Sequence, residues 1–259
     1  MIIQKEPVFK AGNILTHEML EILKEASIDS QELKYTGYSD GVLKGCAIST
    51  APGYIKVGKG VIILNSIPYY IYSQIEVPIQ ATNELLLLIA RAVEEQKEVD
   101  YIVRQVEVAL ITKEQLLESD IELCRFRLQT GAMLRTNYRD FQDMSTEYDT
   151  VCLKNAKWSA YGKGSISIEV LKKYMSEALK CNINSPEDKQ FLSRIAATDG
   201  TTLNADEINL YLSWRLNQPF KERNNDEIYK ALTETLKLVK GERANTVGRH
   251  MEHRRLIVD

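Results

Sequence analysis

Acidic residues gather between positions 140 and 149, the part of the chain whose side chains best suit acid–base chemistry. They are Asp140, Asp143, Glu147 and Asp149. Two carboxyl groups on either side of a glycosidic bond catalyse its hydrolysis, so one hypothesis is a hydrolase that acts on a cell-surface polymer. Two acids a few residues apart on one segment rarely straddle a sugar, however. A hydrolase is therefore the alternative hypothesis.

Arginine and aromatic side chains are interleaved with these acids. Protein–protein interfaces are enriched in both residue types. The composition of this segment therefore favours an interaction strip over a catalytic pair, and the sequence predicts a non-enzyme with no catalytic residue. The candidate interface residues are Arg135, Tyr138, Arg139, Phe141 and Tyr148.

Two Gly-Lys-Gly stretches, residues 58–60 and 162–164, resemble phosphate-binding loops in composition. A P-loop requires Gly-x-x-x-x-Gly-Lys followed by Ser or Thr, between a strand and a helix. In the first stretch Gly60 replaces the hydroxyl residue, and Val61 begins a β-branched run where a helix should open. The second stretch lacks the upstream glycine. Both are predicted to be turns or linkers, and no cofactor is expected.

The residue types that bind metals do not form a recognisable site. Four cysteines, at positions 46, 124, 152 and 181, lack the Cys-x-x-Cys spacing and are expected to be reduced and buried. His250 and His253 have a spacing compatible with a metal, but no third ligand is evident, so an exposed tail is the simpler interpretation. No metal is expected.

The C-terminal residues 242–259 are polar and basic, which leaves a nucleic-acid-binding regulator as a second alternative. Its candidate phosphate contacts are Arg243, Arg249, Arg254 and Arg255. The whole chain carries a net charge of −3 and has a pI near 5.8. A chain of this charge does not make nucleic acid the expected partner.

Length and hydrophobicity limit the organisation of the chain. With 259 residues it is long enough for two domains of about 100 to 150 residues each. Its most hydrophobic run, Leu85–Ala90, is far shorter than a bilayer-spanning helix. The start shows no secretory signal pattern. The protein is expected to be made in the cytoplasm and to stay there unless it leaves as part of a particle.

The elements that would position these residues change along the chain from β to α. Val8 and Phe9 suggest a first strand together with residues 2–3, and Thr16 is placed to cap one short helix. Seven of the 13 glycines then fall within residues 1–60, among short Val, Ile and Tyr runs. This crowding is typical of the turns and bulges of a small antiparallel sandwich or barrel. Long paired strands are predicted at residues 85–93 and 99–110, and the turn pair Asn65-Ser66 should join two shorter ones.

Beyond residue 164 the pattern becomes helical. Ser167, Ser185, Asn204 and Asn225 are placed to begin four helices, and Gly241 to end the last. Short helices with short polar links predict a small bundle.

The sequence therefore predicts an α+β chain, with an N-terminal antiparallel β-sandwich or barrel that carries one short helix and a C-terminal small helical bundle. Four segments are expected: a β-rich docking domain (1–111), a partly extended connector (112–164), a helical domain (165–241) and a polar tail (242–259).

Five segments share a common order of strand and turn signatures: Tyr35–Gly41, Ile55–Ile63, Pro68–Tyr72, Leu85–Ile89 and Leu123–Arg135. Together they make the first part of the chain, residues 1–150, similar to the baseplate-associated structural proteins of contractile phage tails and of phage-tail-like bacteriocins of Gram-positive bacteria. The resemblance implies a β-sandwich attachment domain, several copies in a symmetric assembly, and other baseplate or tail proteins, including a tail fibre, as partners. It also implies that the protein ends as part of a phage-tail-like particle. It transfers no catalytic residue.

Overall fold

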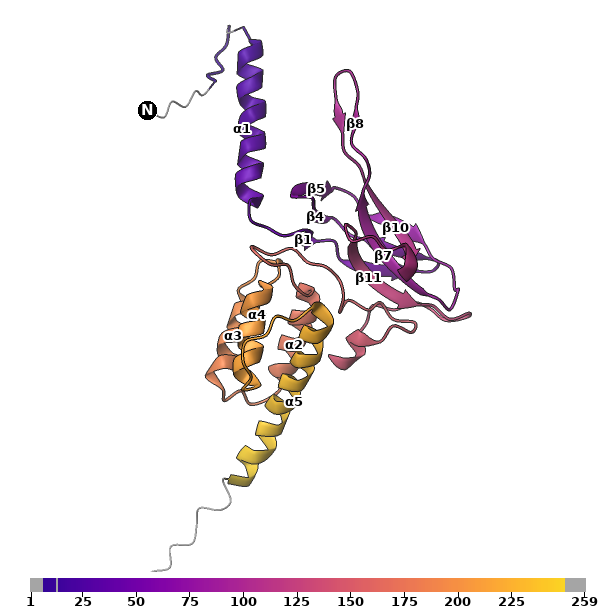
Figure 1. The fold of residues 1–259 in the computed structure, drawn as a ribbon, viewed down its shortest axis with the longest axis vertical. Helices are drawn as coiled ribbons and strands as arrows, with labels where there is room; N and C mark the ends of the chain where they lie inside the picture. The colour runs from indigo at the N-terminus through magenta and orange to yellow at the C-terminus, as the bar shows by residue number, and fades with distance from the viewer. Residues whose placement is uncertain (1–6, 13, 250–259) are drawn as a thin grey trace, which may run out of the picture. The chain divides into compact units, whose positions relative to one another are not determined.

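The structure is a computed structural model that describes residues 7–12 and 14–249. The chain divides into two compact units, residues 1–37 and residues 38–259. The described secondary structure of the first unit is one helix, α1 (His17–Tyr35) (Figure 1). Among the described residues, all the strands and the remaining helices belong to the second unit.

Helix α1 begins where the sequence predicts it. The backbone N–H of Met19 donates to Thr16 Oγ1 at 3.3 Å, which confirms Thr16 as the capping residue. The helix has 19 residues and is therefore longer than the short helix expected. Val8 and Phe9 are not in a strand, and the other half of that predicted strand, residues 2–3, lies outside the described residues.

The glycine-rich segment forms two antiparallel sheets. Asn65 and Ser66 adopt φ angles of 52° and 63°. Two successive positive φ angles match the right-handed twist of a tight hairpin, which confirms the predicted turn. In spatial order the strands are β1 (Gly41–Gly45), β4 (Gly60–Leu64) and β5 (Ile67–Ile71) in one sheet, and β2 (Ile48–Ala51), β3 (Tyr54–Val57) and β6 (Ile75–Pro78) in the other.

A third antiparallel sheet places the most hydrophobic strand at its centre. Its order is β10 (Val106–Thr112), β7 (Leu85–Ala92) and β11 (Ile121–Arg127). Leu88 and Ala90 of β7 enter the main core, whereas Leu87 and Ile89 pack with Ile111 in a separate cluster. The prediction of a strand buried on both faces is confirmed. Beyond β7 and β10 the chain continues as a short two-stranded ribbon, β8 (Gln96–Lys97) and β9 (Ile102–Val103).

Four helices complete the second unit, and this confirms the predicted α+β class. They are α2 (Ile168–Ala178), α3 (Pro186–Ala196), α4 (Ala205–Arg215) and α5 (Asn225–Arg249). Ser167, Ser185 and Asn204 each accept a backbone N–H from the first turn of their helix, as predicted. At α5 the cap is Asn224, one residue earlier than expected, because its side chain accepts from Glu227 N–H. The helix also continues through Gly241, so the first part of the expected tail is helical.

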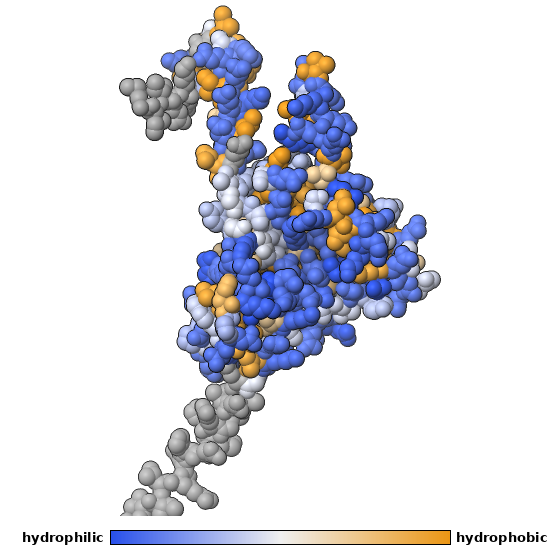
Figure 2. Space-filling model, in the orientation of Figure 1, coloured by the Kyte–Doolittle hydropathy of each residue, from blue (hydrophilic) through white to orange (hydrophobic). Residues whose placement is uncertain are grey.

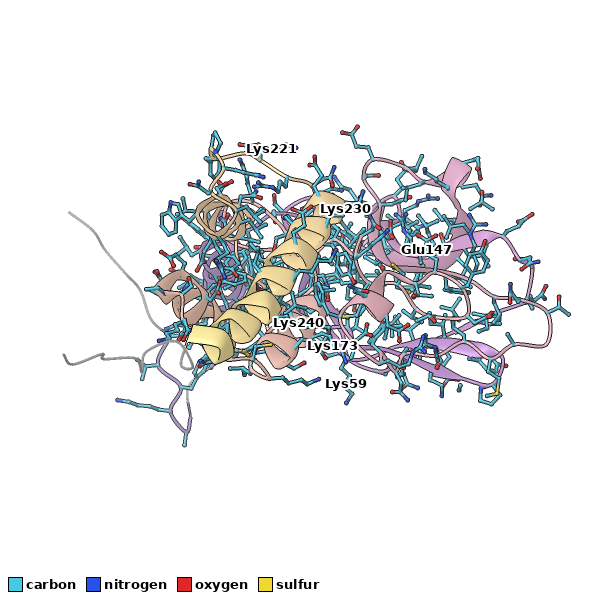
Figure 3. The ribbon with its side chains drawn as sticks, turned by 90° about the horizontal axis from the view of Figure 1, so that it is seen from below. Lys59, Glu147, Lys173, Lys221, Lys230 and Lys240 are labelled. Atoms are coloured by element: carbon cyan, nitrogen blue, oxygen red, sulfur yellow. The ribbon has the colours of Figure 1, made fainter. Side chains whose placement is uncertain are left out.

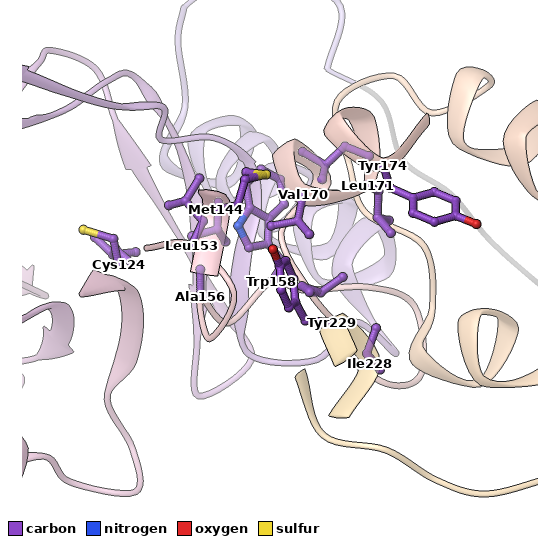
Figure 4. Close-up of a cluster of buried hydrophobic side chains, with 14 of the residues drawn as sticks. Cys124, Met144, Leu153, Ala156, Trp158, Val170, Leu171, Tyr174, Ile228 and Tyr229 are labelled. Atoms are coloured by element: carbon purple, nitrogen blue, oxygen red, sulfur yellow. The ribbon is translucent and has the colours of Figure 1, made fainter. Parts of the chain in front are cut away.

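Residues 112–164 are an integral part of the fold. They supply β11 and two short 3₁₀ turns, η1 (Lys113–Gln115) and η2 (Gln142–Ser145). Met144, Leu153 and Trp158 are buried in the same core as residues from the sheets and helices. Figure 4 shows them beside α2. The expected connector is therefore folded into the core, because its apolar side chains fill the space between sheet and bundle. The boundaries of all four predicted segments stay predictions.

The first Gly-Lys-Gly stretch is a site of close backbone approach, in agreement with the predicted turn. A Cβ on Gly60 would lie 2.5 Å from the carbonyl oxygen of Lys44 and would also overlap the backbone of Cys46.

We expect Gly60→Ala to lower the free energy of unfolding by about 2 kcal/mol, because the clash involves backbone that must shift. Urea denaturation of both variants measures this. Gly58→Ala is the control, since its Cβ would lie 3.3 Å from its nearest neighbour, and an equal effect of both substitutions would contradict the prediction.

Candidate interaction surfaces

Asp143 is the most constrained of the acids between positions 140 and 149. Two guanidinium nitrogens of Arg135 donate to its two carboxylate oxygens at 2.7 and 2.8 Å. The backbone N–H of Arg139 donates to the same carboxylate at 2.8 Å. The Asp143 side chain is 3% exposed. The Arg135 guanidinium therefore holds the pKa of Asp143 well below its usual range.

The neighbouring acids also bind backbone. Asp140 accepts the N–H of Asp143 at 2.9 Å, and Asp149 accepts the N–H of Gln129 at 2.9 Å. A general acid needs a pKa near the working pH and a proton to give, whereas Asp143 is held ionised. Asp140 and Asp143 thus fix the turn at η2, and Asp149 holds the backbone at Gln129. This arrangement opposes the hydrolase hypothesis for residues 140–149.

The structure brings three of the predicted interface residues together around Asp143. Arg135 and Arg139 contact its carboxylate, and the Tyr138 hydroxyl donates to the carbonyl oxygen of Val151 at 2.6 Å. Of these, Arg139 has a side chain that is 84% exposed. Its availability to a partner agrees with the predicted strip.

The other two predicted interface residues, Phe141 and Tyr148, differ in burial. Phe141 is buried and stacks on Tyr229 with ring centroids 4.8 Å apart, so its side chain is not available to a partner. Tyr148 is 55% exposed, and the Arg127 guanidinium lies 5.9 Å from its ring centroid. The interface role stays a prediction that now rests on Arg139 and Tyr148.

A groove between α3 and α4 presents a large exposed aromatic side chain. Trp214 is 57% exposed and Leu210, one turn earlier on α4, is 38% exposed. The groove floor includes Phe191 and Tyr211, whose rings stack with centroids 3.9 Å apart. Glu187 and other polar residues lie at its sides. The α3–α4 groove is a concave, apolar surface with a polar rim.

Sequence reasoning missed this groove, although a signal was present. Ile208 and Leu212 of α4 are buried, while Leu210 and Trp214 of the same helix are exposed. A surface helix that packs on one core typically has a single apolar stripe. Helix α4 has apolar residues on its exposed side as well. The excess on α4 indicates a second contact surface.

The β part has its own exposed aromatic surface. Tyr70 and Tyr72 stack at 6.0 Å with an interplanar angle of 14°, and Tyr72 is 80% exposed. They line a hollow together with Val106 and Val108 of β10.

Two lysines of α5, Lys230 and Lys240, are engaged with acids. Lys230 pairs with Asp226 at 2.5 Å, and Lys240 pairs with Glu177 at 3.7 Å (Figure 3). Phosphate binding needs cations that are available to the ligand, which weakens the regulator hypothesis for this helix. The tail residues that carried it, Arg254 and Arg255, lie outside the described residues.

Among the residues that the structure describes, no three His, Cys, Asp or Glu side chains are grouped so as to hold a metal ion. The predicted metal pair, His250 and His253, lies outside them. None of the described helices has the length and apolar character that crossing a membrane requires.

Comparison with known proteins gives weak structural likenesses. No protein-family model and no curated protein matches the chain. A likeness to the crystal structure of TssK covers 92% of this chain and 71% of that chain, at 8% sequence identity and a TM-score of 0.41. Another, to a chain of the type VI secretion system TssK-TssF-TssG baseplate subcomplex, covers 90% of this chain and 99% of that one, at 8% identity and a TM-score of 0.35. At these TM-scores neither likeness establishes a shared fold.

Proposed function

We propose that this protein is a structural component of the baseplate of a contractile, phage-tail-like particle. Its β part docks on the assembly, and its helical part binds a neighbouring subunit or a fibre. The observation that carries the proposal is the α3–α4 groove with Trp214 exposed at its edge. The sequence resemblance of residues 1–150 to baseplate-associated proteins supports the choice of assembly.

The groove has the anatomy of a protein-binding hot spot. Hot spots are enriched in Trp, and surrounding polar contacts exclude water from them. At the groove, Arg194 and Glu207 form an ion pair with N–O distances of 2.6 and 3.2 Å and belong to the rim. Covering Trp214 removes a large apolar surface from water and stabilises a complex by about 2 kcal/mol. A neighbouring subunit with a complementary apolar side chain fits this surface.

Replacing Trp214 by alanine tests the proposal. We expect Trp214→Ala to weaken binding to co-expressed baseplate or tail proteins from the same gene cluster by about tenfold or more, because an anchor of the interface is lost. Titration in a binding assay, with mass photometry of the complexes, measures the change.

Leu179→Ala provides the matched control. Leu179 is 61% exposed, comparable to Trp214, but it lies at the end of α2 and outside the groove. Equal effects of the two substitutions would remove the groove from the proposal. Failure of the wild-type chain to bind any tail or baseplate protein would refute the proposed function itself.

A further inference from the structure

A two-stranded ribbon extends beyond the third sheet and forms an arm, which we define as residues 93–105. It continues the β7–β10 pair, since the N–H of Val93 donates to the carbonyl oxygen of Gln105 at 2.9 Å. The strands β8 and β9 follow, and a turn closes where Glu98 N–H donates to the carbonyl oxygen of Tyr101 at 2.8 Å. With about six residues on each side, the arm reaches about 20 Å beyond the sheet. Figure 1 shows it projecting past the end of β7 and β10.

The arm carries apolar side chains that contact no core. Every residue from 93 to 102 is exposed. Val99 is 100% exposed, Tyr101 is 70% exposed and Ile102 is 56% exposed. Figure 2 shows the apolar tip above a hydrophilic shaft. An isolated two-stranded hairpin is at best marginally stable in water, so an arm with an apolar tip is suited to contact with another surface.

The charges of the arm indicate the chemistry of that surface. The arm contains four carboxylates and two cations, which leaves an excess of two negative charges. Glu95 and Arg104 pair with each other across the ribbon at 2.8 Å. In the part of the chain that the structure describes, Glu94, Glu98 and Asp100 have no ion-pair partner. Two of these three, Glu98 and Asp100, flank Val99 at the turn.

We propose that the arm inserts its tip into an apolar pocket rimmed by Lys and Arg on a different protein of the assembly. Val99 and Tyr101 would enter the pocket, and Glu98 and Asp100 would meet the basic rim. Complementary charge fixes the orientation of such a contact and speeds its formation. An arm-to-arm contact between two copies would place Glu98 and Asp100 against themselves, so like-charge repulsion opposes it. The inference rests on the proposed function, in which the β part docks on the assembly. It adds the kind of surface that the arm of the β part binds.

Site-specific photo-crosslinking identifies the protein that the tip of the arm contacts. The photo-reactive residue p-benzoylphenylalanine replaces Val99 in cells that produce the particle. The same residue in place of Leu117 is the control, since Leu117 is also exposed but lies outside the arm. We expect position 99 alone to cross-link to a different polypeptide. Mass spectrometry should place the link within a peptide that contains Lys or Arg beside apolar residues. A link to a second copy of this chain, a link to a peptide without basic residues, or no product would overturn the proposal.

Charge reversal tests the rim. Glu98→Lys combined with Asp100→Lys should lower the yield of the cross-link, and the affinity for the identified partner, by about tenfold or more. Glu84→Lys combined with Glu118→Lys changes the net charge equally at exposed sites outside the arm and should have no such effect. Equal losses in both double variants would overturn the arm proposal. Whether the wild-type chain is present in purified particles is measured separately, so failure of the arm and failure of the proposed function are distinguishable.

Discussion

Replacing Asp188 by alanine is expected to lower the free energy of unfolding by about 4 kcal/mol, because it removes a buried carboxylate that pairs with the largely buried Arg215 guanidinium. Arg215 Nε donates to both carboxylate oxygens of Asp188 at 3.0 and 3.1 Å. The Asp188 side chain is 2% exposed and that of Arg215 is 14% exposed. The Tyr211 hydroxyl donates to the same carboxylate at 2.9 Å and would lose its acceptor. Urea denaturation followed by circular dichroism measures the loss.

Two further variants isolate the charge from the packing. Asp188→Asn keeps an acceptor for Tyr211 but removes the negative charge, so we expect it to destabilise less than alanine does. Asp188→Leu combined with Arg215→Met removes both charges and should regain much of the stability, since apolar replacements of buried ion pairs are often neutral or stabilising. If the double variant were less stable than Asp188→Ala, the uncompensated charge would not be the cause.

Asp143→Asn is expected to lower the free energy of unfolding at pH 7 by about 3 kcal/mol, because it removes a charge-assisted pair that holds the turn at η2. The pKa of Asp143 is lowered chiefly by its hydrogen bonds to Arg135. A lowered pKa means that this stabilisation is fully present above about pH 3.9, the ordinary value for Asp, and is lost as the pH falls further toward the folded-state pKa. The difference between wild type and Asp143→Asn should therefore shrink as the pH drops below about 4.

Urea denaturation of both proteins between pH 2 and pH 7 measures this difference. Glu147→Gln is the control, since Glu147 belongs to the same acidic segment but makes no ion pair within the described residues. A pH-independent difference would contradict the assignment. The hydrolase hypothesis makes the opposite prediction, namely that Asp143→Asn abolishes polymer hydrolysis without a large loss of stability.

Local chemistry explains which predictions the structure confirms. Thr16, Ser167, Ser185 and Asn204 cap their helices because a short polar side chain satisfies the first N–H groups wherever a helix follows. The run Leu85–Ala90 is apolar at successive positions, which favours a strand buried on both faces. In both cases the physical cause lies within a few residues of the sequence.

Predictions that depended on distant contacts were the ones that changed. Phe141 looked like an interface residue, but Tyr229 on α5 covers its ring. Gly241 looked like a helix end, but α5 continues through it to Arg249. A glycine ends a helix only where the chain turns away, and its sequence neighbours alone do not decide this.

The sequence by itself determined the α+β class, the caps of four of the five described helices, the Asn65-Ser66 turn and the central strand, because capping, φ preference and hydrophobic periodicity act locally. Only the tertiary structure decided what the reactive side chains near η2 do and which apolar side chains stay exposed. The fold places Arg135 in an ion pair with Asp143, which gives this carboxylate a structural role. Trp214 and the tip of the arm are candidate contact sites because their side chains remain exposed outside the core. Burial and pairing are settled by residues far apart in the chain, so spacing along the sequence does not fix them.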